Sequence, residues 1–116
     1  MQVKILGRLP TCNEYIEACR INRFKGAKMK RETEEMIMWQ AAGLPRIETP
    51  FIISFVWLEE TTKRDPDNVA FAKKFILDAL QKAGKLENDN CKFVRGFRDS
   101  FVYGGEQGVL IEIEEA

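Results

Sequence analysis

Four stretches of the chain show the hydrophobic pattern of β-strands. Phe51 to Leu58 is apolar, aromatic or β-branched almost throughout, which is typical of a central strand covered on both faces. Cys91 to Arg98 and Val109 to Ile113 each place alternate side chains on one side. Val3 to Leu9 alternates more weakly, and Pro10 ends it. The sequence therefore predicts four strands, with Phe51 to Leu58 at the centre of the sheet.

Two further stretches favour helices. From Asp67 to Ala83, apolar side chains recur on one face at the helical period. Arg31 to Ala42 is rich in helix-forming residues, and we expect Met36 and Trp39 in it to face inward. Thr11 to Lys30 has no clean period, so we expect a long, mobile connection there.

The order of these elements predicts an α/β (α+β) fold. We expect a single small domain over residues 1–116, with a mixed β-sheet of about four strands carrying two helices. A chain of 116 residues is long enough for one modest core and leaves little room for a second module. Phe51 to Leu58 is the longest apolar run and is too short to span a bilayer, so no membrane role is expected.

Cysteine and histidine content limits the chemistry. Cys12, Cys19 and Cys91 are odd in number and widely spaced, and Met1 to Gly7 lacks the build of a signal peptide, so a reducing cytoplasm is expected. The chain has no histidine, which excludes Cys–His nucleophiles, most zinc sites and a histidine general base. Catalysis would therefore depend on carboxylates and lysines.

Charge is unevenly distributed although the net charge is zero. Residues 1–46 hold nine basic and five acidic side chains, whereas residues 47–116 hold nine basic and thirteen acidic ones. Residues 20–31 include six bases and no acid. These bases are Arg20, Arg23, Lys25, Lys28, Lys30 and Arg31. A loop of this composition can follow a phosphate backbone, and equally it can be a solvated loop that only carries charge.

Two closely spaced acids follow the central strand. Asp65 and Asp67 project to the same side of an extended backbone, and Pro66 holds Asp65 in extended geometry. Asp89 follows the second predicted helix and would complete a divalent-ion site if the fold brings it back to this pair. The alternative is structural, because Asp-Pro-Asp-Asn is also a turn and N-cap composition and residues 87–90 also suit a polar loop.

With these residues placed, the chain resembles the RusA family of Holliday junction resolvases, crossover junction endodeoxyribonucleases that prophages commonly encode. The similarity rests on Leu9-Pro10, Asn13, Tyr15, Arg64-Asp65-Pro66-Asp67-Asn68, Lys74, Asp78-Ala79-Leu80-Gln81-Lys82-Ala83-Gly84 and Asp89. It covers most of the chain, but only residues 64–89 match densely.

The resemblance implies roles for individual residues. Asp65, Asp67 and Asp89 match catalytic acids that hold Mg²⁺ or Mn²⁺, Lys74 matches an essential lysine, and Arg64 matches a basic residue linked to DNA contact. We expect the remaining DNA-binding side chains to be basic. They are Arg23, Lys25, Lys28, Lys30 and Lys73. The family also implies a homodimer acting on branched DNA, such as a four-way junction.

Two departures from the family pattern leave alternatives open. Asn88 stands where the family often has a second acid, which would lower the affinity for the ion. An apparent three-residue insertion near Ala70 to Ala72 leaves Lys73 and Lys74 as alternatives for the functional lysine, with counting back from Asp78 favouring Lys74.

The leading hypothesis is a magnesium-dependent endonuclease that resolves Holliday junctions by phosphodiester hydrolysis in DNA recombination and repair. The alternative is a non-catalytic branched-DNA-binding accessory protein, and a third reading is a small interaction module without a nucleic-acid role. Phe93, Phe97 and Phe101 suit either a dimer interface or the core, and we favour the core.

Overall fold

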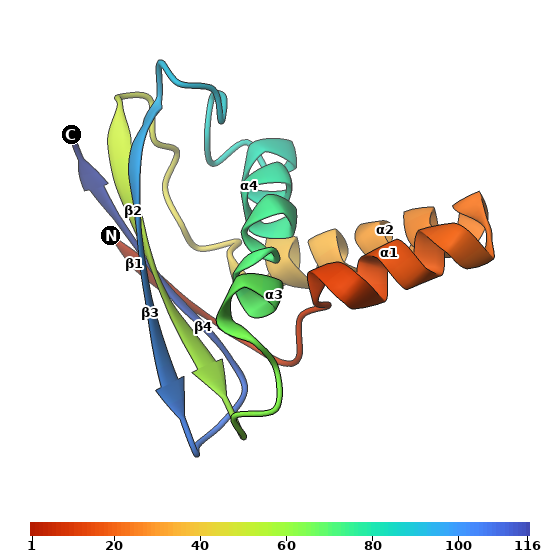
Figure 1. Cartoon of the computed structure of the whole chain (residues 1–116). Helices are drawn as coiled ribbons and strands as arrows, with labels where there is room; N and C mark the ends of the chain where they lie inside the picture. Colours follow the sequence, from red (N-terminus) through yellow and green to blue (C-terminus); the bar gives the residue numbers. More distant parts are fainter.

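A strand near the middle of the sequence also lies in the middle of the sheet. In the computed structural model, which describes residues 1–116, β2 (Phe51–Glu59) pairs in parallel with β3 (Val94–Tyr103) and antiparallel with β4 (Gly108–Glu115). β1 (Gln2–Leu6) pairs antiparallel with β4, so the strand order is β1-β4-β2-β3 (Figure 1). The predicted α+β class and the four-stranded mixed sheet are therefore confirmed.

All the helices lie on one side of this sheet (Figure 1). They are α1 (Cys12–Ile21), α2 (Arg23–Gln40), α3 (Pro66–Ala70) and α4 (Lys73–Lys82). Buried apolar side chains from the sheet and the helices form one continuous cluster. None of the helices is both long enough and apolar enough to cross a lipid bilayer.

The central strand is covered on one face only, so the prediction of cover on both faces is wrong. Side chains at every second position of β2 are buried, from Phe51 to Glu59, while the intervening ones are only half-buried. The sequence pattern predicted two covered faces because the side chains on the uncovered face, such as Ile52, Val56 and Leu58, are also hydrophobic. The strand position was predicted correctly, and only its environment differs.

The segment predicted as a mobile connection is helical. α1 begins after Thr11, whose side-chain oxygen accepts a hydrogen bond from the backbone N–H of Glu14, while Glu14 in turn accepts one from the backbone N–H of Thr11. α2 begins at Arg23 rather than at Arg31. The apolar period is missing because this part of the chain buries little, with Ala18 the one buried residue of α1. The Thr11-x-x-Glu14 spacing was the available sequence signal for the start of α1.

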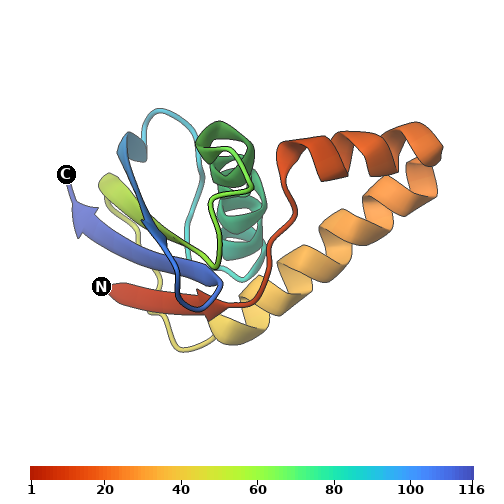
Figure 2. The same cartoon turned by 60° about the horizontal axis from the view of Figure 1, so that its bottom comes forward.

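α1 and α2 form a hairpin that projects away from the sheet (Figure 2). Only Asn22 separates the two helices, and its extended backbone (φ −167°, ψ 160°) makes the turn. The helices pack closely at Gly26, where an added Cβ would lie 2.5 Å from the Sγ atom and 3.2 Å from the Cα atom of Cys19. Gly26 therefore sets the spacing of the hairpin.

Gly26→Val is expected to lower the free energy of unfolding by about 1–3 kcal/mol, because the new side chain must displace the backbone of α1. Gly43→Val is the matched control, since an added Cβ there meets nothing within 4 Å, and its effect should stay within about 0.5 kcal/mol. Chemical denaturation of both variants measures the difference. Equal stability of the two variants would contradict close packing at Gly26.

Two side-chain environments differ from the expectation, those of Trp39 and Phe97. Met36 packs against the core as predicted, but Trp39 is 84% exposed, so its predicted inward orientation is wrong. Phe93 and Phe101 are half-buried against the core, as expected, whereas Phe97 on β3 is 47% exposed and does not belong to the core. The aromatic residues of this region thus divide between core and surface.

The predicted helix from Asp67 to Ala83 is broken at Phe71 and Ala72. The backbone N–H of Ala72 donates to the carbonyl of Val69, and that of Lys74 donates to the carbonyl of Phe71. These i→i−3 bonds tighten the chain locally, and α4 starts anew at Lys73. The break separates the acidic residues at the start of α3 from the lysines of α4.

Candidate active site

Asp65 and Asp67 line the same hollow. Asp65 lies at the N-cap position of α3 with extended backbone geometry (φ −69°, ψ 144°), followed by Pro66, as the sequence predicted. The Asp65 side chain makes no capping hydrogen bond, and neither carboxylate has an ion-pair partner in the chain. The hollow has a volume of about 300 Å³. Its lining residues are Cys12, Asn13, Asp65, Asp67, Asn68 and Phe71. Two carboxylates without an ion-pair partner thus line one hollow.

The start of α1 closes the other side of this hollow. The backbone N–H of Asn13 donates to the side-chain oxygen of Asn68 at 2.9 Å. Beneath this contact, the ring of Tyr15 stacks on Phe71 at 6.0 Å and meets Phe75 edge-on at 5.3 Å. These contacts fix α1 against α3 and α4. Asn13 and Cys12 were not predicted as lining residues because the helix that carries them was not recognised.

Asp89 does not join the pair within one chain. It belongs to the connection between α4 and β3, and this connection leaves α4 at the end opposite to α3 (Figure 1). Nowhere in the structure do three or more acidic or thiol side chains gather closely enough to hold one ion. A single chain therefore brings together Asp65 and Asp67 and leaves Asp89 apart.

The two candidate lysines differ in their surroundings. The Nζ atom of Lys73 lies 2.8 Å from the Oδ2 atom of Asp99 and 4.3 Å from the ring centre of Phe97. Asp99 is itself held by the indole N–H of Trp57, which donates to it at 2.9 Å. Lys74 is 61% exposed, with its Nζ atom 3.2 Å from Asp78. The Lys73 side chain is therefore bound to Asp99 on the sheet, and Lys74 is the more exposed of the two lysines.

A charge network between α2 and α4 includes Lys30. Its Nζ atom lies 3.0 Å from Asp78 and 3.4 Å from Glu34, a buried carboxylate that also lies 2.7 Å from the Nζ atom of Lys82. The hydrogen bond to Asp78 raises the pKa of Lys30. Burial acts to raise the pKa of Asp78, but hydrogen bonds from Lys30 and Lys74 outweigh it, and the net pKa is lowered. Lys30 thus holds helices together, a contact that does not suit its predicted role in DNA binding.

Arg64 is also engaged inside the fold. Its Nε atom lies 2.8 Å from the Oε1 atom of the buried Glu59, and its guanidinium donates to the backbone carbonyl of Leu9 at 3.2 Å. These contacts tie the segment after β2 to the segment before α1. The geometry therefore gives Arg64 a positioning role next to Asp65.

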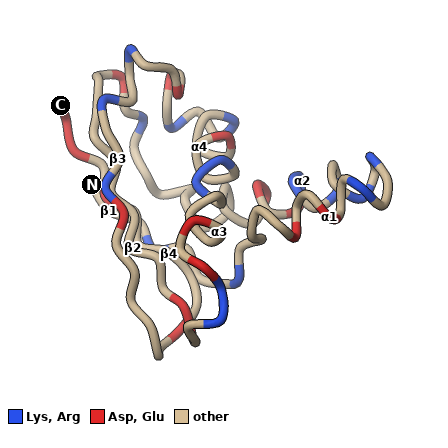
Figure 3. Tube along the Cα trace, in the orientation of Figure 1, with Lys and Arg blue, Asp and Glu red and all other residues tan.

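Arg23, Lys25 and Lys28 are exposed on the hairpin, where Figure 3 shows basic positions gathered toward the outer ends of α1 and α2. The Nζ atom of Lys28 lies 3.8 Å from Glu32, and both side chains are solvent-exposed, so this pair contributes little and leaves the lysine available. These three residues are the predicted DNA-binding side chains that remain free to meet a ligand.

Neither a scan against protein-family models nor a search of curated proteins finds a match to this sequence.

Proposed function

We propose that the protein is a metal-dependent, structure-selective endodeoxyribonuclease that cuts branched DNA, including Holliday junctions, in DNA recombination and repair in the cytoplasm. The observation that carries the proposal is the hollow in which Asp65 and Asp67 lie together without a cationic partner. Two adjacent carboxylates repel each other, and a divalent cation relieves this repulsion. The resemblance of residues 64–89 to RusA-type resolvases supports the same assignment.

The donor set fits Mg²⁺ or Mn²⁺, because Mg²⁺ is typically held by one or two carboxylates together with water and substrate phosphate. Asp65 and Asp67 would hold the ion. When bound, such an ion supplies Lewis-acid stabilisation of the phosphate oxygens and acidifies water. Lys74 is exposed and neutralises charge that develops on the phosphate, while Arg23 and Lys25 bind the DNA backbone away from the scissile bond.

A second copy of the chain would complete the acidic site. β3 runs parallel to β2 with Tyr103 beside Glu59, so the segment that carries Asp65 leaves the sheet near the end of β3, whereas Asp89 precedes its beginning. If two β3 strands pair antiparallel about a two-fold axis, the beginning of one strand lies beside the end of the other. The partner subunit's Asp89 then approaches Asp65 and Asp67.

The β3 edge suits such pairing. β3 is the outermost strand of the sheet, and one side of its backbone has no strand partner. It contains no proline, and it exposes the apolar side chains of Phe97, Val102 and Tyr103. A symmetric dimer also places two sites on the two symmetry-related strands of a four-way junction.

Incubation with a labelled four-way junction tests the proposed function. With Mg²⁺ or Mn²⁺ the protein should nick the junction near its branch point, and it should leave a linear duplex of the same sequence intact. Chelation of the ion should stop the reaction. Failure to cut the junction with any divalent ion, at protein concentrations that retard it in a gel, would contradict the nuclease proposal.

The separation of Asp89 from Asp65 and Asp67 favours a second candidate, a non-catalytic protein that binds branched DNA. Asn88 also favours this candidate, because an amide oxygen brings no charge to a metal site. This candidate predicts retarded but uncut junctions in the same assay.

A further inference from the structure

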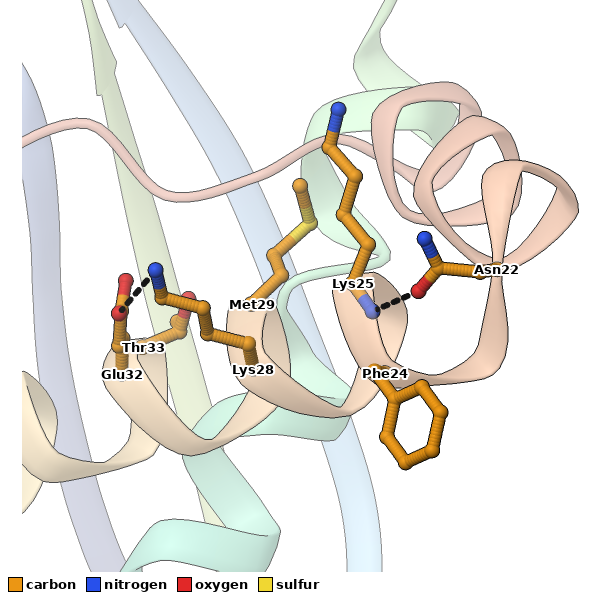
Figure 4. Close-up of a pocket in the computed structure, with 7 residues that line it drawn as sticks. All are labelled: Asn22, Phe24, Lys25, Lys28, Met29, Glu32 and Thr33. Carbon is orange, nitrogen blue, oxygen red and sulfur yellow. Dashed lines mark hydrogen bonds and ion pairs between the residues drawn. The ribbon is translucent and has the colours of Figure 1, made fainter.

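Phe24 occupies an unusual position for an aromatic side chain. It lies in the first turn of α2, at the outer end of the hairpin, and 71% of its surface is exposed. Figure 4 shows its ring extending away from α2, with none of the other labelled side chains covering it. The guanidinium of Arg23 lies over one face of the ring, with its carbon 5.0 Å from the ring centre. Phe24 therefore contributes nothing to the core.

The hairpin tip is built firmly enough to present this ring. The side-chain oxygen of Asn22 accepts a hydrogen bond from the backbone N–H of Lys25 at 2.8 Å, which caps α2. Gly26 brings α1 and α2 into close contact one turn further on. The tip thus has a defined geometry, with Phe24 fixed on a capped helix.

The surface around the ring is mostly basic. Residues 20–31 contain no acid, and Lys25 and Lys28 line a hollow of about 590 Å³ together with Phe24 and Met29 (Figure 4). Glu32 also lines this hollow, but its exposed pair with Lys28 at 3.8 Å contributes little and leaves the lysine available. This volume falls within the range of small-ligand sites. An exposed aromatic ring among cations is the combination with which proteins bind unpaired nucleic acid, because every base offers a face for stacking and the cations bind phosphates.

We propose that Phe24 stacks on an unpaired base of branched DNA while Arg23, Lys25 and Lys28 bind the flanking phosphates. This inference rests on the proposed function for the nature of the ligand. It adds a means by which the protein distinguishes a branch point from a continuous duplex, since a duplex offers no unstacked base to the ring.

Equilibrium binding without divalent ions tests this role. The probes are a forked DNA with unpaired bases at the branch, one of them the fluorescent base 2-aminopurine, and a blunt duplex of equal length. Phe24→Ala should weaken binding to the fork by about tenfold and remove the fluorescence change, because one base stack is lost. Its duplex affinity and thermal unfolding midpoint should match those of the wild type.

Three further variants serve as controls. Phe24→Tyr should bind the fork within about twofold of the wild type, because it keeps the ring. Ile21→Ala removes an exposed apolar side chain that cannot stack and should change neither affinity. Lys25→Ala should weaken fork and duplex binding alike and reduce the salt slope by about one.

The outcomes separate the two proposals. If Phe24→Ala binds the fork as the wild type does, or loses fork and duplex binding equally, the stacking role is overturned while the nuclease proposal stands. If the wild-type protein binds neither DNA at low salt, both proposals fail, and the exposed ring serves another kind of partner.

Discussion

Asp67→Asn is expected to abolish cleavage of a four-way junction while leaving its binding intact. The change keeps the size of the side chain and removes one of two unpaired carboxylates from the hollow at the start of α3. Loss of one stabilising group at a reacting centre typically lowers the rate by at least about a hundredfold. DNA affinity should be equal to or slightly above that of the wild type, because a negative charge near phosphate is removed. Single-turnover cleavage and gel retardation measure the two effects separately.

Glu60→Gln is the matched control for Asp67→Asn. It removes one carboxylate from the exposed segment between β2 and α3, and Glu60 does not line the hollow. Its cleavage rate should stay within about twofold of the wild type, since exposed charges away from a site have small effects. Normal turnover by Asp67→Asn would remove Asp67 from the site and with it the basis of the proposal.

Mixing two inactive variants is expected to restore cleavage. A mixed dimer of Asp67→Asn and Asp89→Asn has one site with both substitutions and one site with none, provided that each site takes Asp67 from one subunit and Asp89 from the other. Random reassociation forms mixed dimers as about half of all dimers, so about a quarter of the wild-type sites should recover. Nicking of one strand per junction is the measurement, because a mixed dimer has a single intact site.

A second mixture provides the control for subunit exchange. Asp65 and Asp67 line one hollow within one chain, so a mixed dimer of Asp65→Asn and Asp67→Asn has one substitution at each site and should stay inactive. Recovery in this mixture would show that the two residues serve different sites. Absence of recovery with Asp67→Asn and Asp89→Asn, in dimers shown to exchange, would exclude the β3-paired arrangement.

Local signals in the sequence predicted the sheet well and the hairpin poorly. All four strands were found because apolar side chains recur along them, although their bounds shifted, as in β3, which begins at Val94 rather than Cys91. α1 and the first part of α2 were missed because helices that bury mainly Ala18 and Gly26 carry no amphipathic period. The capping pair Thr11 and Glu14 was the remaining signal.

In the candidate site, too, features set by neighbouring residues were predictable from the sequence, and contacts between distant residues were not. Pro66 constrains Asp65 through bonded geometry, so the placement of the acidic pair followed from the sequence. The contact of Lys30 with Asp78 joins residues 48 positions apart and depends on how α2 packs on α4, which no local pattern encodes. The position of Asp89 relative to Asp65 depends in the same way on the direction of α4.

The one-residue turn at Asn22 allows the lengths of α1 and α2 to change together. Because α1 and α2 run side by side up to this turn, adding about one helical turn to each would move the tip outward by ~5.4 Å. The hollow beside Asn13 would keep its lining. The reach of the tip and the lining of the hollow are thus structurally separable, because a change in the length of the two helices alters the first and leaves the second in place.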